Sequence, residues 1–239
     1  MGRGAAGDAA HAGLFITATD TGVGKTILTA ALLAAMAQEG VPATALKPVL
    51  TGTAEAPDGG EHDHELLARI GGLAAEEVAP FTFPLAASPH LAAEAAGRPL
   101  EGAQLIAVCR KRLAQARERG QLMLVEGVGG LLVPLTDDLL VRDLLCELRL
   151  PALIAARPTL GTINHTLLTL AAARAASIEV AAVVLTPWPS SPGPIERSNR
   201  ATITRLGAVE VAVLPALSDR SPGALAAAGA TLPWRRWCS

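Results

Sequence analysis

The residues best suited to chemistry in the first part of the chain lie in the segment Ala18-Thr19-Asp20-Thr21-Gly22-Val23-Gly24-Lys25-Thr26. The segment follows an apolar run, 13–17, and precedes an Ala- and Leu-rich stretch, which predicts a strand, a tight turn and a helix in succession. Backbone N–H groups in such a turn, together with the positive end of the helix, bind an anion. The spacing is typical of a phosphate-binding loop, in which Lys25 reaches the terminal phosphates of a nucleotide and the Thr26 hydroxyl ligates Mg²⁺. A chance Gly-Lys-Thr in a surface turn is the alternative, and the flanking strand and helix argue against it.

Lys47 and Glu126 are expected at the same edge of a sheet as this loop. Lys47 follows the apolar run 43–46, and Pro48 holds it in an extended conformation. Glu126 follows four apolar residues, 122–125, which predict a buried strand, although a plain strand and turn would leave the same pattern. In open parallel sheets, ligands bind beyond the carboxyl ends of the strands. Lys47 is therefore presented at the ligand-binding edge, which also carries the phosphate loop, and Glu126 is a candidate Mg²⁺ ligand.

A cluster of acidic residues and histidines, Glu61-His62-Asp63-His64-Glu65, opens a helix predicted to end near Ile70. Three interpretations are open: a transition-metal site, a Mg²⁺ ligand with its neighbours, and ordinary capping, since acidic residues stabilise a helix N-terminus. His62 and His64 are two residues apart and point away from each other on a helix, which argues against a shared metal. Asp63 is the candidate Mg²⁺ ligand in this cluster.

Two further helices have well-marked beginnings. Ser88-Pro89-His90 places a capping serine before a proline at the first helical position, which needs no functional explanation. The segment Thr159-Leu160-Gly161-Thr162-Ile163-Asn164-His165 leads into a helix predicted to reach Ala176. The N-terminus of that helix is a second position suited to an anion, such as a substrate carboxylate.

The alternation of strands and helices predicts an α/β fold, with a mostly parallel sheet covered by helices on both faces, of the P-loop NTPase type. Residues 13–239 are expected to form one domain, and residues 1–12 a flexible N-terminal arm. Prolines from Pro187 onwards are expected to end the strand that begins at Val180. The tail that contains Trp234 and Trp237 is not assigned. The expected strands are 13–17, 43–46, 122–125, 152–156, 180–185 and 209–214, the main helices are 25–38, 61–70, 101–119 and 139–148 with two more ending near 176 and 206, and 80–84 is expected to be irregular or edge-like.

Composition excludes several classes of protein. The chain has 20 basic and 22 acidic residues, a near-neutral balance without the electrostatic footprint of a nucleic-acid-binding protein. Cys109, Cys146 and Cys238 lie far apart without metal-binding spacing, which is typical of reduced thiols in a cytosol. The sequence has neither a signal-peptide core nor a run of ~18 apolar residues. We therefore expect a soluble, cytoplasmic protein with neither nucleic acid nor a membrane as partner.

Five segments, in the same order along the chain, resemble the dethiobiotin synthetase family, the ATP-dependent carboxylases of biotin synthesis. Together they extend over roughly residues 14–215, and the set is specific although the phosphate loop alone is common. The five are Thr19-Asp20-Thr21-Gly22-Val23-Gly24-Lys25-Thr26, Lys47-Pro48-Val49 with Thr51-Gly52, Ser88-Pro89-His90, Val125-Glu126-Gly127-Val128-Gly129-Gly130 and Gly161-Thr162-Ile163-Asn164-His165.

The resemblance implies a reaction in which 7,8-diaminononanoate (7,8-diaminopelargonate), CO₂ and ATP become dethiobiotin, ADP and phosphate through a carbamate and a carbamic-phosphoric anhydride. Because these species are anionic, the site must supply cations and oriented N–H groups. The resemblance implies that Lys47 and Lys25 are the catalytic residues and that Thr26, Asp63 and Glu126 hold Mg²⁺. The nucleotide-binding residues that it implies are Gly22, Val23, Gly24, Lys25, Thr26, Ile27, Asp63, Glu126, Gly127, Val128, Gly129, Thr186, Pro187, Leu214, Pro215 and Ala216. The implied substrate-binding residues are Thr21, Lys47, Thr51, Gly161, Thr162, Ile163 and Asn164, the last four from the partner subunit of a homodimer with the substrate at its interface.

The chain departs from the family pattern where some members have Asn-Asp to recognise the adenine edge. It has Thr186-Pro187 there, and threonine offers one hydroxyl in place of a planar amide, which predicts a relaxed choice of nucleotide. The main alternative function is a partition-type switch ATPase of the same superfamily. Such proteins carry an extra lysine near the start of the phosphate loop, where this chain has Ala18-Thr19-Asp20.

Overall fold

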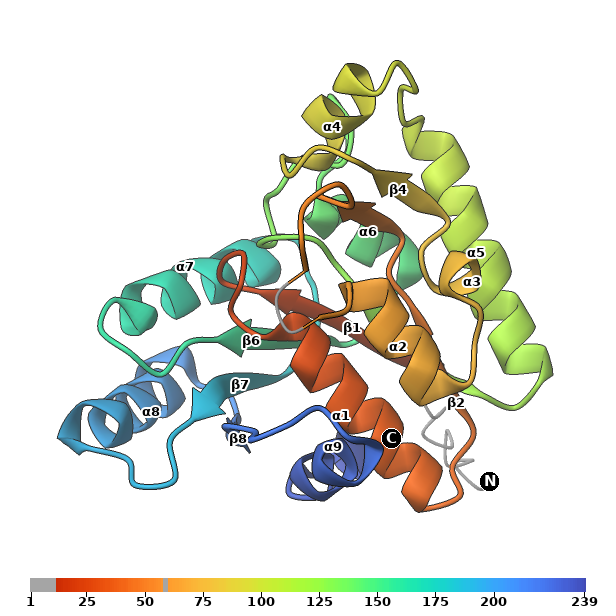
Figure 1. The fold of residues 1–239 in the computed structure, drawn as a ribbon. Helices are drawn as coiled ribbons and strands as arrows, with labels where there is room; N and C mark the ends of the chain where they lie inside the picture. The colour runs from red at the N-terminus through yellow and green to blue at the C-terminus, as the bar shows by residue number, and fades with distance from the viewer. Residues whose placement is uncertain (1–11, 58–59) are drawn as a thin grey trace, which may run out of the picture.

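Six parallel strands form the central sheet of the protein (Figure 1). The computed structural model describes residues 12–57 and 60–239. From one edge of the sheet to the other, the strand order is β2, β5, β1, β6, β7, β8, which confirms the predicted parallel α/β fold. From β1 the chain first adds β2 and β5 on one side and later adds β6, β7 and β8 on the other side. Such a reversal of strand order opens the crevice in which α/β proteins bind ligands. The strands are β1 (Gly13–Ala18), β2 (Ala43–Leu46), β5 (Leu122–Glu126), β6 (Ala152–Ala156), β7 (Val180–Trp188) and β8 (Val211–Pro215).

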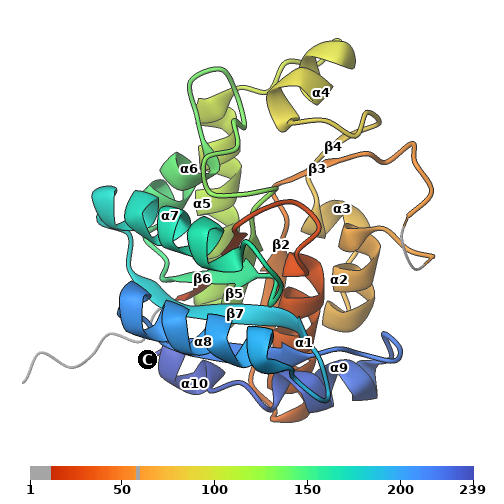
Figure 2. The same cartoon turned by 90° about the vertical axis from the view of Figure 1, so that its left-hand side faces the viewer.

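Helices cover both faces of this sheet (Figure 1 and Figure 2). Successive side chains of a strand point to opposite faces, so Leu14 and Ile16 of β1 pack in a core with α1, α2, α9 and α10, whereas Phe15 packs in a core with α4, α5 and α6. A smaller core, which contains Ile154 and Val183, lies under α7 and α8. The helices are α1 (Lys25–Gln38), α2 (Asp63–Gly71), α3 (Ala75–Val78), α4 (Pro89–Ala95), α5 (Gly102–Glu118), α6 (Val141–Leu148), α7 (Thr162–Ala175), α8 (Pro194–Gly207), α9 (Pro222–Gly229) and α10 (Trp234–Trp237).

A second, two-stranded parallel sheet lies beyond the carboxyl end of β2 (Figure 1). It pairs β3 (Val49–Thr51) with β4 (Phe81–Phe83), so the segment expected to be irregular or edge-like is a short strand of this sheet. Strands of three residues are too short to show an alternating pattern, which is why the sequence did not reveal the pairing. The Lys47 N–H donates to the carbonyl of Val78 at 2.8 Å and so ties the start of this sheet to α3.

The prediction that β7 ends at Leu185 was wrong, because the strand continues to Trp188. Pro187 lies within it, at a point where the pairing register with β8 shifts between Leu185 and Trp188. A proline is tolerated in a strand where no ladder hydrogen bond is needed from its nitrogen. The Ala216 N–H then donates to the Trp188 carbonyl at 2.8 Å, which keeps the ends of β7 and β8 together.

The C-terminal tail, which the sequence left unassigned, forms α9 and α10 and covers α1. Trp234 and Trp237 are each 3% exposed and belong to the same core as α1. The contact between α1 and α9 depends on Gly229, since a β-carbon there would lie 2.0 Å from the carbonyl oxygen of Ala31 and 2.9 Å from Ala35 Cβ. Figure 1 shows the two helices side by side.

Gly229→Ala should therefore destabilise the fold, because the two helix backbones cannot separate without disturbing the core. We expect a loss of about 1–3 kcal/mol, as is typical of an overpacked interior, and a melting temperature lower by several degrees. Gly223→Ala, in the same helix, is the matched control: nothing lies within 4 Å of its β-carbon position, so its melting temperature should be unchanged or slightly higher. Equal melting temperatures for the two variants would contradict the packing argument.

Two further predictions concern the N-terminal arm and the presence of a membrane-spanning helix. Of the predicted arm at residues 1–12, only Ala12 is among the described residues, so the arm remains a prediction. Across residues 12–57 and 60–239, no helix is both long and apolar enough to cross a membrane.

Candidate functional site

The segment between β1 and α1 forms a tight loop at the N-terminus of the helix. Gly22 and Gly24 have φ angles of 67° and 104°, in the left-handed region that favours glycine. Gly24 is the N-cap of α1, and a β-carbon there would lie only 3.0 Å from Thr186 Cγ2. The first N–H groups of α1 have no partner within the helix, and the helix dipole is positive at this end. The loop can therefore hold an anion such as a phosphate.

The Lys25 side chain folds back beside this loop. Its ammonium donates to the carbonyl of Gly129 at 2.9 Å and to that of Asp20 at 3.2 Å. Burial lowers the pKa of Lys25 to about 8, although the nearby carboxylates of Glu126 and Asp63 act in the opposite direction. A bound polyphosphate would favour the charged form of the ammonium.

Four polar side chains from separate segments meet next to Lys25. Lys47 Nζ lies 2.5 Å from Asp63 Oδ2 and 2.6 Å from Glu126 Oε1, and the Thr26 hydroxyl donates to the same Glu126 oxygen at 2.8 Å. The strand order explains the meeting, because β2, β5 and β1 are neighbours and deliver Lys47, Glu126 and the phosphate loop to one edge. Asp63 arrives from the other direction, as the first residue of α2.

Burial and charge act against each other in this cluster. Burial alone would lower the pKa of Lys47, which is 4% exposed, but the carboxylates of Glu126 and Asp63 outweigh it and raise the pKa. Burial would raise the pKa of Asp63, and the ammonium of Lys47 reverses this and lowers it. Lys47 and Asp63 are thus held in their charged forms by mutual attraction.

The residues present fit a Mg²⁺ ion. Glu126 Oε2 is buried and has no hydrogen-bond partner among the described residues, which leaves it available as a ligand. Carboxylate and hydroxyl oxygens, here from Asp63, Glu126 and Thr26, are ligands that Mg²⁺ prefers, and it usually takes only one or two carboxylates together with water and substrate phosphates. The described residues hold no group of three or more His, Cys, Asp or Glu side chains that could bind a metal by themselves.

The histidines near Asp63 have a simpler explanation than a shared transition metal. The ring centroids of His62 and His64 are 6.0 Å apart. The His62 N–H donates to the Glu65 carboxylate at 2.7 Å, the reciprocal contact of a helix cap. Capping therefore accounts for this part of the cluster.

A cavity of about 550 Å³ opens above these residues. Most of the candidate residues around the phosphate loop line it: Thr21, Gly22, Gly24, Lys25, Thr26, Ile27, Lys47, Thr51, Asp63, Val128 and Gly129. Glu126 is 1% exposed and does not line the cavity itself, but its carboxylate contacts Lys47, which does. A β-carbon on Gly127 would lie 3.1 Å from Phe15 Cε1, so this glycine packs against the core and does not line the cavity.

Other candidate residues lie outside this cavity. Thr162 and Val23 line a separate cavity of about 90 Å³ on the outer side of the phosphate loop, and Gly161 is the N-cap of α7. Thr186 is 2% exposed and packs against Gly24, at the ends of β7 and β8. The candidate residues that line neither of these two cavities are Glu126, Gly127, Gly161, Ile163, Asn164, Thr186, Pro187, Leu214, Pro215 and Ala216.

The cavity is also lined by residues that were not among the predicted site residues. Leu50, Gly52 and Ala86 come from the β3–β4 side, and their place depends on the undetected small sheet. Arg220 comes from the loop after β8. No local pattern marks Leu50, Ala86 or Arg220, whereas Gly52 belongs to one of the segments that carry the family resemblance. The remaining lining residues are Glu55, Ala56, Pro57, Glu61, His62 and Leu66, of which Glu61 and His62 belong to the cluster of acidic residues and histidines seen in the sequence.

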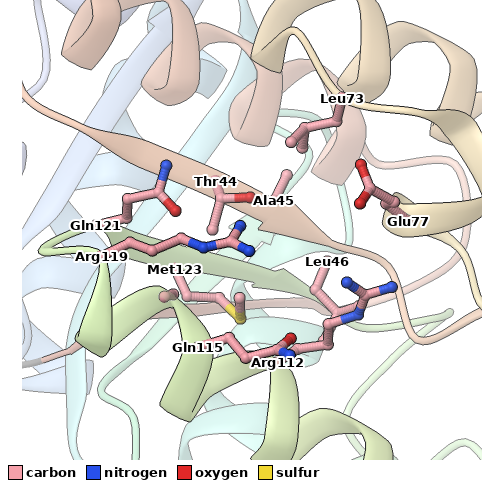
Figure 3. A pocket seen from close by; sticks show the side chains of 11 residues that line it. Thr44, Ala45, Leu46, Leu73, Glu77, Arg112, Gln115, Arg119, Gln121 and Met123 are labelled. Carbon is pink, nitrogen blue, oxygen red and sulfur yellow. The ribbon is translucent and has the colours of Figure 1, made fainter.

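A third hollow lies at the outer edge of the sheet, beside β2. Its volume is about 50 Å³, and Figure 3 shows Arg112 and Arg119 next to the strand. None of the candidate site residues lines it. It contributes nothing to the phosphate-loop site.

Known proteins are similar to this chain in sequence or in fold. The family described as an AAA domain matches residues 12–222. The ATP-dependent dethiobiotin synthetase BioD of Mycobacterium avium (strain 104) is 41% identical over 204 residues, which cover 85% of this chain and 86% of the relative. The enzyme of the same name from Bacillus licheniformis is 39% identical over 213 residues, and the one from Mycobacterium tuberculosis (strain CDC 1551 / Oshkosh) is 37% identical over 227, covering 88% and 94% of this chain and 88% and 96% of the relatives.

A solved structure supports the fold alone. Chloroplast FtsY from Physcomitrella patens superposes with a TM-score of 0.53 at 17% identity, over 93% of this chain and 66% of that chain. The relatives and the assembled phosphate-loop site lead to one family. The chain belongs to the ATP-dependent dethiobiotin synthetases.

Proposed function

We propose that this enzyme uses ATP to close a cyclic urea, converting 7,8-diaminononanoate and CO₂ to dethiobiotin with release of ADP and phosphate. The dethiobiotin synthetases that match most of its length support the reaction. The single observation that carries the site is that the ammonium of Lys47 lies within 2.6 Å of both Asp63 and Glu126 at the mouth of the phosphate loop. A site that gathers cations around phosphate suits phosphoryl transfer to another anion.

The proposed chemistry has two transfers. One amine of the substrate first carries a carbamate, whose oxygen attacks the terminal phosphorus of ATP, so that a P–O bond forms and ADP leaves. The second amine then attacks the carbonyl carbon of this mixed anhydride, a C–N bond forms, a proton leaves the nitrogen and phosphate departs. The ring closes without any oxidant or reductant.

The residues divide this work by charge. Lys25 and the N–H groups of the loop would bind the phosphates of ATP, and Lys47 would balance the charge of the carbamate and of the phosphoryl group in transfer. Thr51 and Thr21 both line the cavity and would hydrogen-bond the diamine or its carbamate. Thr26, Asp63 and Glu126 would hold Mg²⁺, which supplies positive charge to the nucleotide phosphates.

The test of this function is a product assay. The protein, ATP and Mg²⁺ are incubated with and without the diamine and bicarbonate, and both ADP and dethiobiotin are measured. Release of ADP that depends on the diamine, with one dethiobiotin per ADP, is expected. ADP release that ignores the diamine would instead fit a switch ATPase.

The surface around α7 and α8 supports the proposed homodimer. Leu160, Leu168, Ile195 and Leu206 are large apolar side chains that are 92%, 61%, 56% and 52% exposed, and all lie on or beside these helices. The segment 161–164 at the start of α7 directly follows Leu160, so a second copy that covered this surface would receive that helix N-terminus. A substrate carboxylate held there is the role that we propose for Gly161, Thr162, Ile163 and Asn164.

The base of the nucleotide should be selected weakly. Thr186 packs against Gly24 and presents no planar amide, and Pro187 has no N–H to donate, so this strand end lacks the paired donor and acceptor that read a base edge. We expect kcat/KM for ATP, CTP and GTP to agree within about tenfold, because strong rejection requires buried polar groups that the wrong base leaves unpaired. Calorimetric binding of the three diphosphates would separate base recognition from turnover. A preference for ATP above about 10²-fold would show that other groups read the base.

A further inference from the structure

The short loop between β6 and α7 makes contacts that the proposed reaction does not use. Its first residue, Arg157, is exposed and lies on the outer side of the phosphate loop, opposite the 550 Å³ cavity. Arg157 Nη2 donates to the carbonyl of Gly22 at 3.2 Å and, more weakly, to that of Thr21 at 3.4 Å. Both acceptors are backbone carbonyls of the phosphate loop.

These two contacts fix the direction of the neighbouring N–H groups. A peptide unit is planar and trans, so its C=O and N–H point in opposite directions. Holding the Thr21 and Gly22 carbonyls toward Arg157 turns the N–H groups of Gly22 and Val23 away from it. A glycine-rich loop could otherwise rotate these peptides at little cost.

A buried amide holds the same loop from behind. Asn199 of α8 is 7% exposed, and its Nδ2 donates to the carbonyls of Pro158 at 2.8 Å and of Thr159 at 3.2 Å. The β6–α7 loop is therefore attached to α8 by Asn199 and to the phosphate loop by Arg157.

We propose that Arg157 is a positioning residue for nucleotide binding: by holding two carbonyls outward, it directs the N–H groups of the phosphate loop toward the nucleotide phosphates, and Asn199 holds Arg157 in reach. This inference rests on the proposed function only in taking a nucleoside polyphosphate as the ligand of the loop. In this role Arg157 acts through the peptides of the phosphate loop and not through a contact with the nucleotide.

The test is the binding of Mg²⁺-ADP in the absence of the diamine, measured by calorimetry. Arg157→Ala should bind ADP roughly fivefold to tenfold more weakly, the effect of losing one hydrogen bond of ordinary net strength, with an unchanged melting temperature. About 20 mM guanidinium chloride, far below a denaturing concentration, should restore part of this affinity, since the 90 Å³ cavity beside Arg157 can admit the ion. The same concentration of sodium chloride controls for screening.

Two further variants complete the design. Arg119→Ala removes an exposed arginine beside the edge strand β2, in a hollow that contains none of the phosphate-loop residues, and should bind ADP normally. Asn199→Asp removes both donors while keeping the shape of the side chain, so it should weaken ADP binding without rescue by guanidinium. If this variant does not fold, Arg157→Ala decides the question alone.

Three results would contradict the proposed role of Arg157. Native affinity in Arg157→Ala, failure of guanidinium to restore any affinity, or equal restoration by sodium chloride would each overturn the proposal. The product assay on the native protein is independent of these measurements. An enzyme that formed no dethiobiotin would refute the proposed reaction, while ADP binding would still decide the role of Arg157.

Discussion

Lys47→Ala should abolish dethiobiotin formation, with kcat lowered at least about 10²-fold, while the protein keeps its fold. The ammonium of Lys47 lies between Asp63 and Glu126 and faces the cavity in which phosphate and carbamate would meet. Removing it leaves the charge of the transferring phosphoryl group without one of the two lysine ammonium groups that line the cavity. Product formation under saturating ATP and diamine is the measurement.

Folding must be separated from chemistry in this variant, because truncating one partner of a buried ion pair destabilises a protein by about 3–5 kcal/mol. Lys47→Met keeps the length of the side chain and provides a second, better-packed variant. Lys111→Ala, an exposed lysine of α5, is the control and should keep both melting temperature and activity. Near-normal turnover in a folded Lys47 variant would overturn the proposed role.

The sequence predicted the main sheet and its edge because the signals there are local. Apolar runs mark β1 and β5, a glycine turn precedes α1, and Lys47 and Glu126 directly follow predicted strands. The parallel fold alone implied that these side chains share one edge. The contact between them required the strand order, in which β2, β5 and β1 are neighbours, and no local pattern reveals that order.

The features that the sequence did not reveal depend on distant partners. The pairing of β3 with β4 involves only three residues on each side, so no period could indicate it. The burial of Trp234 and Trp237 depends on α1, some 200 positions earlier, and on the absence of a side chain at Gly229. Arg157 and Asn199 bind backbone carbonyls, which every residue type provides, so their partners cannot be read from the sequence.

The candidate residues at the start of α7 show the same limit at the level of assembly. Gly161, Ile163 and Asn164 line neither the main cavity nor the small one within a single chain. A local pattern correctly predicted a helix N-terminus there, but in the proposed homodimer the site that it serves includes the surface of a second copy. Leu160 beside it is 92% exposed, as expected of an apolar side chain that a second copy would cover.

Glu126→Gln should raise the Mg²⁺ concentration needed for half-maximal activity by at least about tenfold. Glutamine keeps the oxygen that accepts from Thr26 and Lys47, but it replaces the buried, unpartnered Oε2 with an amide nitrogen that cannot bind a cation. A structural role would lower activity equally at every Mg²⁺ concentration, whereas a ligand role shifts the whole Mg²⁺ dependence. Glu210→Gln, which changes a carboxylate that pairs with Trp237 away from the site, should leave that dependence unaltered. If Glu126→Gln has the native Mg²⁺ dependence, the carboxylate serves only to hold Lys47, and Mg²⁺ must be held by other oxygens.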